Sequence, residues 1–315
     1  MKSVQGIVKN ILSGERVAVA RSISMIENEH ADAVELLKHI YLHTGKAYRI
    51  GITGPPGAGK STITNKLAKL YRQENKKVGI IAVDPTSPFT GGALLGDRVR
   101  MTDVETDDGV FIRSMASRGS LGGLSKKAGE AADVLDAAGC DMIILETVGV
   151  GQSELDIARA ADTTVVVLVP ESGDSIQAMK AGLMEIADFF VVNKADRAGA
   201  EQAVMSIKMV LNFRNNPAGW SPDVLQAVAS NGKGIDRIAE MILTHRNFLE
   251  QNNMLKEKRK ERAKVRIRDL IGEHLRVEFW NSERTAILES HIDSVVSLKN
   301  TPYDLAGLLL KSFRK

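Results

Sequence analysis

Residues 51–62, GITGPPGAGKST, combine residue types and spacing that suit phosphate binding. They match the pattern G-x-x-x-x-G-K-[ST]. Glycines let backbone N–H groups wrap phosphate oxygens, the lysine reaches the β- and γ-phosphates, and the serine hydroxyl suits Mg²⁺. The stretch follows an apolar run and precedes an amphipathic segment, which is the strand–loop–helix context that the pattern requires. We therefore expect nucleotide phosphates to bind at Gly54, Gly57, Ala58, Gly59, Lys60, Ser61 and Thr62.

A second pattern, N-K-x-D, ends the apolar run FFVVNKAD and comprises Asn193, Lys194 and Asp196. An aspartate carboxylate here can accept two hydrogen bonds from the N1–H and exocyclic amine of guanine. Adenine has no such donor pair and would leave the carboxylate unpaired. Lys194 can cover the base, and Asn193 can hydrogen bond to the phosphate loop. The stretch AVASNG, which includes Ala229, is expected to complete the pocket, so we expect GTP rather than ATP.

Acidic residues follow other apolar runs. Asp84 ends the run KVGIIAVD, Asp97 lies further along a Gly/Ser/Thr-rich stretch, and Glu146 ends DMIILE. Carboxylates beside a phosphate site suit Mg²⁺ or its bound water, and with Ser61 they form the predicted metal site. For the first two aspartates a cluster of turn residues is the alternative, because Asp-Pro and Gly-Gly are turn signals. Gly149 is expected to donate its N–H to the γ-phosphate and to release it after hydrolysis.

Seven short apolar runs between residues 48 and 229 must position these groups. Near-continuous β-branched runs separated by helical segments predict an α/β fold, a mostly parallel sheet with helices on both faces. Ligands of such sheets bind at the carboxyl ends of the strands, so the motifs should meet there. Helical periodicity elsewhere divides the chain into an N-terminal helical extension (1–47), a P-loop nucleotide domain (48–233) and a C-terminal helical region (234–315).

Composition sets limits on location and partners. The 315 residues carry a net charge of +3, which is too small to argue for nucleic acid. No apolar run reaches the roughly 20 residues that cross a bilayer, and no signal peptide is recognisable. The single cysteine, Cys140, excludes an intrachain disulfide, is interpreted as a packed core residue, and fits a reducing cytosol, so a cytoplasmic location is expected.

The strings GITGPPGAGKST, VDPTSPFTGGALLGDRVRM, ETVGVGQSE and NKAD together resemble the MeaB/ArgK-type GTPases, which are P-loop proteins of the SIMIBI class. The resemblance covers nearly the whole chain. It implies Mg²⁺-linked positions at Ser61, Asp84, Asp97 and Glu146, and a homodimer formed by the C-terminal helices. It also implies a metallochaperone that gates adenosylcobalamin delivery to an acyl-CoA mutase, typically methylmalonyl-CoA mutase, and protects or reactivates that enzyme. An adenosyltransferase would be a further partner.

The same resemblance marks PESGDSIQAMKAG, which contains Lys180, as a third switch that responds to a partner; the start of a crossover helix is the alternative. Val150 stands where many GTPases have a catalytic glutamine, and Gln152 follows two residues later. We therefore expect slow hydrolysis until a mutase orders Gln152, Lys180 or the loop around them. Lys60 is the remaining predicted catalytic residue.

Other functional classes fit less of the sequence. An assembly GTPase that binds protein or RNA through the basic run KEKRKERAKVRIR is the alternative, although such a run is also typical of a solvated helix face. Metal-inserting relatives carry Cys or His clusters, whereas this chain has one cysteine and no paired ligands at such spacing. An older label for the family, a kinase for amino-acid transport, is disfavoured because no protein-kinase catalytic loop is present.

Overall fold

The structure, a computed structural model, describes residues 3–85, 104, 106–117, 123–147, 153–172, 181–212 and 219–313. Its described strands form one seven-stranded parallel sheet in the order β3-β2-β4-β1-β5-β6-β7. Each strand coincides with one of the predicted apolar runs, and burial on both faces explains why those runs lack polar alternation. The strands are β1 (Tyr48–Thr53), β2 (Val78–Pro85), β3 (Val110–Ser117), β4 (Met142–Thr147), β5 (Thr163–Leu168), β6 (Phe189–Val192) and β7 (Val224–Gln226).

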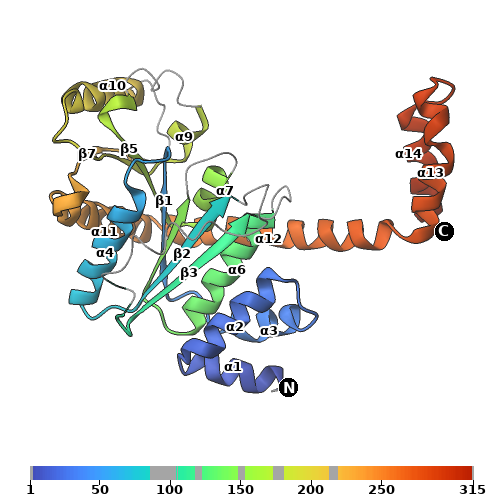
Figure 1. Ribbon diagram of the computed structural model, residues 1–315, viewed down its shortest axis with the longest axis horizontal. Helices are drawn as coiled ribbons and strands as arrows, with labels where there is room; N and C mark the ends of the chain where they lie inside the picture. Colours follow the sequence, from blue (N-terminus) through green and yellow to red (C-terminus); the bar gives the residue numbers. More distant parts are fainter. Residues whose placement is uncertain are drawn as a thin grey trace. The chain divides into compact units, whose positions relative to one another are not determined.

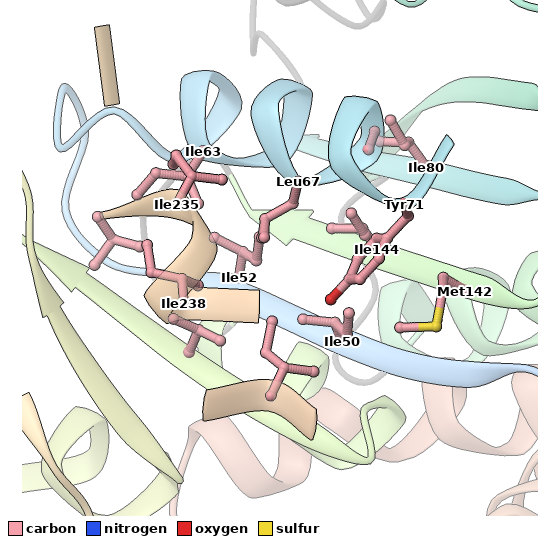
Figure 2. Close-up of a cluster of buried hydrophobic side chains, with 14 of the residues drawn as sticks. Ile50, Ile52, Ile63, Leu67, Tyr71, Ile80, Met142, Ile144, Ile235 and Ile238 are labelled. Atoms are coloured by element: carbon pink, nitrogen blue, oxygen red, sulfur yellow. The ribbon is translucent and has the colours of Figure 1, made fainter. Parts of the chain in front are cut away.

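One face of the sheet is covered by α4 (Lys60–Gln73) and α11 (Ile235–Gln251). Leu67 of α4 and Ile238 of α11 belong to the same buried cluster as Ile50 and Ile52 of β1, as Figure 2 shows. The helix that follows the phosphate-binding motif is therefore anchored by its apolar stripe, and its N-terminus is held at the carboxyl end of β1.

The other face is covered by α6 (Gly123–Ala137), α7 (Ser153–Ala160), α9 (Ala181–Ile186) and α10 (Ala200–Asn212). Three N-terminal helices pack together and against α6 (Figure 1): α1 (Val4–Leu12), α2 (Arg16–Glu27) and α3 (Ala33–Tyr41). Cys140 lies in this core, as predicted, and burial raises the pKa of its thiol to about 12. The thiol is therefore protonated at neutral pH.

The chain divides into two compact units, Met1–Lys258 and Arg259–Lys315. This division differs from the expected boundary at 233/234, because α11 packs on the sheet through Ile235, Ile238 and Ile242. The predicted long helices are α11 and α12 (Met254–Phe279), and the predicted last helix is α14 (Pro302–Phe313). A further helix, α13 (Ser282–Val296), was not predicted. Among the helices that the structure describes, none combines the length and the hydropathy that spanning a bilayer requires.

A buried polar cluster lies at the amino-terminal edge of the sheet, opposite the predicted site. The Thr163 hydroxyl is 2.6 Å from the Tyr48 hydroxyl and 2.8 Å from His245 Nδ1. His245 Nε2 lies 3.4 Å from Asp188, whose carboxylate also pairs with Lys258. Burial lowers the pKa of His245 to about 4, against the opposing effect of Asp188. This histidine is therefore neutral at pH 7.

Candidate nucleotide-binding site

The phosphate loop connects β1 to α4 and requires glycine at two points. Gly54 has φ +134°, and a Cβ there would lie 2.0 Å from the carbonyl oxygen of Val167. Gly59 has φ +90°, and a Cβ there would lie 2.2 Å from Asn193 Nδ2. Because α4 begins at Lys60, the N–H groups and the positive end of its dipole face the loop. The loop is thus shaped to receive an anion.

Two side chains at the start of α4 add the polar chemistry. The buried Lys60 ammonium donates to the carbonyl oxygens of Gly54 and Pro55, each at 2.9 Å. The Ser61 hydroxyl donates to Glu146 Oε1 at 2.5 Å, and both residues are buried. The Lys60 ammonium therefore lies inside the loop, and the hydroxyl–carboxylate pair of Ser61 and Glu146 lies at the loop's end.

The end of β4 touches the loop from two sides. Glu146 points to the α4 face, where it meets Ser61, and the next residue, Thr147, points to the opposite face. There the Thr147 hydroxyl lies 2.9 Å from the hydroxyl of Thr53, the residue just before Gly54. β4 is therefore hydrogen-bonded to the residues on both sides of the loop.

The predicted base-binding loop follows β6. Asn193 is 3% exposed, donates to the carbonyl oxygen of Ala58 at 2.8 Å, and accepts from the Ala229 N–H at 3.0 Å. The predicted link from Asn193 to the phosphate loop is thus confirmed. Lys194 adopts φ +57°, and Asp196 is exposed. One asparagine therefore joins the phosphate loop, the N-K-x-D loop and the stretch after β7.

The profile of the family described as "Methylmalonyl Co-A mutase-associated GTPase MeaB" matches residues 19–284. The chain belongs to the MeaB family. It is a GTPase, which binds GTP and hydrolyses it to GDP and phosphate, on a P-loop GTPase fold.

Several relatives of this MeaB-family chain span most of its length. A putative GTPase of Pyrococcus abyssi is 48% identical over 311 residues, which are 98% of this chain and 96% of that protein. GTPase ArgK of Escherichia coli is 38% identical over 264 residues, 81% of this chain and 80% of that protein. The mouse mitochondrial methylmalonic aciduria type A homolog is 32% identical over 339 residues, 99% of this chain and 80% of that protein. A crystal structure of an LAO/AO transport system kinase has a TM-score of 0.77 and 28% identity, covering 100% of this chain and 99% of its own.

The structure of this MeaB-family GTPase brings many of the predicted site residues together at the carboxyl edge of the sheet. Lys60, Ser61, Glu146 and Asn193 lie there. The backbone of Asp84 belongs to the same edge of β2, in register with Ala116 of β3, but its side chain lies outside what the structure describes. Four predicted residues fall outside the described ranges altogether: Asp97, Gly149, Gln152 and Lys180.

Sequence patterns did not reveal two contacts at this MeaB-family site. One is the bond between the hydroxyls of Thr53 and Thr147, which are 94 residues apart. The other is the ion pair between Arg197, next to the N-K-x-D motif, and Glu171 after β5, in which the guanidinium holds the pKa of that carboxyl below its usual range. A threonine next to each of two motifs was the available signal for the first contact. Nothing local marks the second.

Proposed function

We propose that this GTPase uses GTP binding and hydrolysis to gate adenosylcobalamin delivery to an acyl-CoA mutase, and to protect or reactivate that enzyme. Methylmalonyl-CoA mutase is the expected client. The observation that carries the proposal is the family match across residues 19–284, because the family is described by its association with that mutase. The name of the mouse relative, which refers to methylmalonic aciduria, points in the same direction.

The described contacts support a guanine nucleotide site with separate phosphate and base regions. Lys60 would neutralise phosphate charge, because its ammonium is already held inside the loop by two carbonyl groups. Asp196 would accept the guanine donors, and its exposure leaves the carboxylate accessible to a base. Lys194 would cover the base. The Ala229 N–H donates to Asn193, which also contacts the phosphate loop, so the stretch after β7 is connected to both parts of the proposed pocket.

The donor set also fits Mg²⁺, which prefers oxygen ligands. The Ser61 hydroxyl and the Glu146 carboxylate are in contact at the end of the phosphate loop. We propose these two groups, with the side chains of Asp84 and Asp97, as the residues that hold the ion or its waters. A bound Mg²⁺ would neutralise the negative charge that develops on the phosphates during hydrolysis. Gly149 would contact the γ-phosphate, and Gln152 and Lys180 would become competent on the mutase.

The unit Arg259–Lys315 supports the proposed homodimer. Its part of α12 exposes apolar side chains at 38–56% of their surface: Val265, Ile267, Leu270, Ile271 and Leu275. A helix that leaves several apolar side chains in water is typical of an interaction face. We propose a second copy of this chain there, and an adenosyltransferase as a further partner. Sedimentation of the full chain against an Ile271→Glu variant tests the dimer, and an unchanged mass for that variant would contradict it.

Complex formation tests the proposed client. Purified acyl-CoA mutase and the full chain, mixed with GDP or with a non-hydrolysable GTP analogue, should co-elute in size-exclusion chromatography. Lys60→Ala is the matched control, because it leaves the surface intact and weakens phosphate binding. Absence of a complex in every nucleotide state would refute the client assignment. Salt-dependent RNA binding would instead favour an RNA-binding assembly GTPase. Lys258 and Lys264 of the basic run, however, contact Asp188 and Glu261 within the protein.

A further inference from the structure

Two threonine hydroxyls meet at the carboxyl ends of β1 and β4. The backbone register of β1 and β4 ends at the pair Ile52–Glu146. The next residue of each strand, Thr53 and Thr147, continues the contact through side chains, with hydroxyl oxygens 2.9 Å apart. Beyond this point one chain enters the loop at Gly54, and the other leads through residues 148–152 to α7. The hydroxyl pair is therefore the last contact between β1 and β4 that the structure describes.

The pair lies in a dry environment where the direction of a hydrogen bond matters. Thr53 and Thr147 are both fully buried. They lie on the α7 face of the sheet, since a Cβ on Gly51, two residues before Thr53, would contact Ile157 of α7 at 2.9 Å. A valine pair would fill nearly the same volume without a directional bond. A buried hydroxyl without a hydrogen-bond partner costs free energy, so each threonine restricts the position of the other.

The second hydrogen bond between β4 and the loop, from Ser61 to Glu146, lies where a metal ion would bind. The Ser61 hydroxyl donates to Glu146, and both groups are also the donor set that suits Mg²⁺. A metal ion at this place would compete for those oxygens. Neither Thr53 nor Thr147 faces that side of the sheet. The threonine bond can therefore persist through the nucleotide cycle while the serine–glutamate bond changes.

We propose that Thr53 and Thr147 are positioning residues for GTP hydrolysis. Their bond fixes the carboxyl end of β4 relative to the start of the phosphate loop. GDP binding depends on the loop and on the base pocket, so loss of the bond leaves GDP affinity largely intact. Hydrolysis acts on the γ-phosphate, which GDP lacks, so it is more sensitive than GDP binding to a shift of the end of β4 against the loop. The pair therefore acts on the rate of the chemical step more than on nucleotide binding.

Single-turnover phosphate release, GDP titration and thermal unfolding of full-length variants test this proposal. Thr147→Val and Thr53→Val should each lower the hydrolysis rate about tenfold, which is about 1.4 kcal/mol in the barrier. The GDP dissociation constant should stay within about threefold, about 0.7 kcal/mol. Thr147→Ser keeps the hydroxyl and should restore most of the rate. Should one valine variant fail to fold, the other makes the same test. Hydrolysis within twofold of the unsubstituted protein in the valine variants would overturn the proposal.

The double variant Thr53→Val/Thr147→Val separates positioning from stability. Removing both hydroxyls removes the unpaired group, so unfolding should return toward that of the unsubstituted protein. The rate should stay low, because the directional bond is still absent. A rate that recovers with stability would refute the positioning role. Thr163→Val is the matched control, since it removes a buried hydroxyl bonded to Tyr48 at the opposite edge of the sheet. It should lose stability and keep its rate, and an equal rate loss in this control would also contradict the proposal.

Discussion

Asn193 offers a direct test of how the nucleotide site is assembled. The Asn193→Ala substitution deletes two buried hydrogen bonds, one to the Ala58 carbonyl at 2.8 Å and one from the Ala229 N–H at 3.0 Å. Each buried bond contributes about 1 kcal/mol net, so the variant should lose about 2 kcal/mol of stability. In a domain of this size that corresponds to a melting temperature lower by about 4–8 °C.

Nucleotide affinity should fall as well, because the two hydrogen bonds of Asn193 order the phosphate loop and the stretch after β7 before the nucleotide binds. If the whole loss of about 2 kcal/mol appeared in binding, GDP affinity would fall about 30-fold. Part of the cost is shared by the nucleotide-free protein, so we expect about tenfold. Isothermal titration calorimetry with GDP measures this directly, and differential scanning calorimetry measures the stability.

A matched control is Asn281→Ala, which removes an asparagine that accepts from the Arg284 N–H at the start of α13. This variant should lose stability in its own unit and bind GDP normally. If Asn193→Ala lost stability but kept its GDP affinity within twofold, the two hydrogen bonds of Asn193 would stabilise the fold without ordering the nucleotide site. Ordering of the two loops by Asn193 would then contribute nothing to GDP binding, contrary to the prediction.

Three other predictions concern single residues. Gly54→Ala should abolish GDP binding, because its Cβ would lie 2.0 Å from the Val167 carbonyl oxygen, and normal GDP titration of this variant would contradict the loop geometry. The control Gly129→Ala has open space around the new methyl group and should gain about 0.5–1 kcal/mol of stability. Because burial lowers the pKa of His245 to about 4, the unfolded chain binds a proton between about pH 4 and 6.5 that the folded protein lacks. This stabilising contribution is complete above pH ~6.5, and about 2 kcal/mol of it is lost between pH ~7 and ~5. In urea unfolding, the free energy of unfolding of His245→Gln should therefore fall less with decreasing pH than that of the unsubstituted protein. An equal fall in both proteins would refute the assignment. Asp196→Asn should shift the base preference of hydrolysis from guanine toward xanthine, and unchanged preference would remove this residue from base recognition.

The sheet and the phosphate loop were predictable from sequence because their determinants are local. β1 and β4 are near-continuous apolar runs, and the loop pattern sits between a strand and an amphipathic helix. The helix α13 escaped prediction because its residues are mostly exposed and its sequence, SERTAILESHIDSVV, has a weak apolar stripe. Helices of this kind depend on contacts with neighbouring helices rather than on periodicity.

The contacts that hold the site depend on distant residues and were less accessible. The N-K-x-D pattern did indicate that Asn193 would touch the phosphate loop, because both motifs occupy the same edge of a parallel sheet. Its second bond, to Ala229, joins residues that follow two different strands, β6 and β7, and has no local signal. The Thr53–Thr147 bond requires β1 and β4 to be neighbours, and that strand order is known only from the sheet.

In the function proposed for this protein, an acyl-CoA mutase controls the rate of GTP hydrolysis at the site. Phosphate release by the full chain, measured with GTP and Mg²⁺ while purified methylmalonyl-CoA mutase is added to saturation, tests it most directly. Groups ordered or supplied by partners accelerate other G-proteins by ~10³–10⁵. The rate should rise with mutase and reach a plateau at least about tenfold above the rate of the chain alone, which is about 1.4 kcal/mol of barrier lowering. An unchanged rate at saturating, demonstrably bound mutase would contradict it.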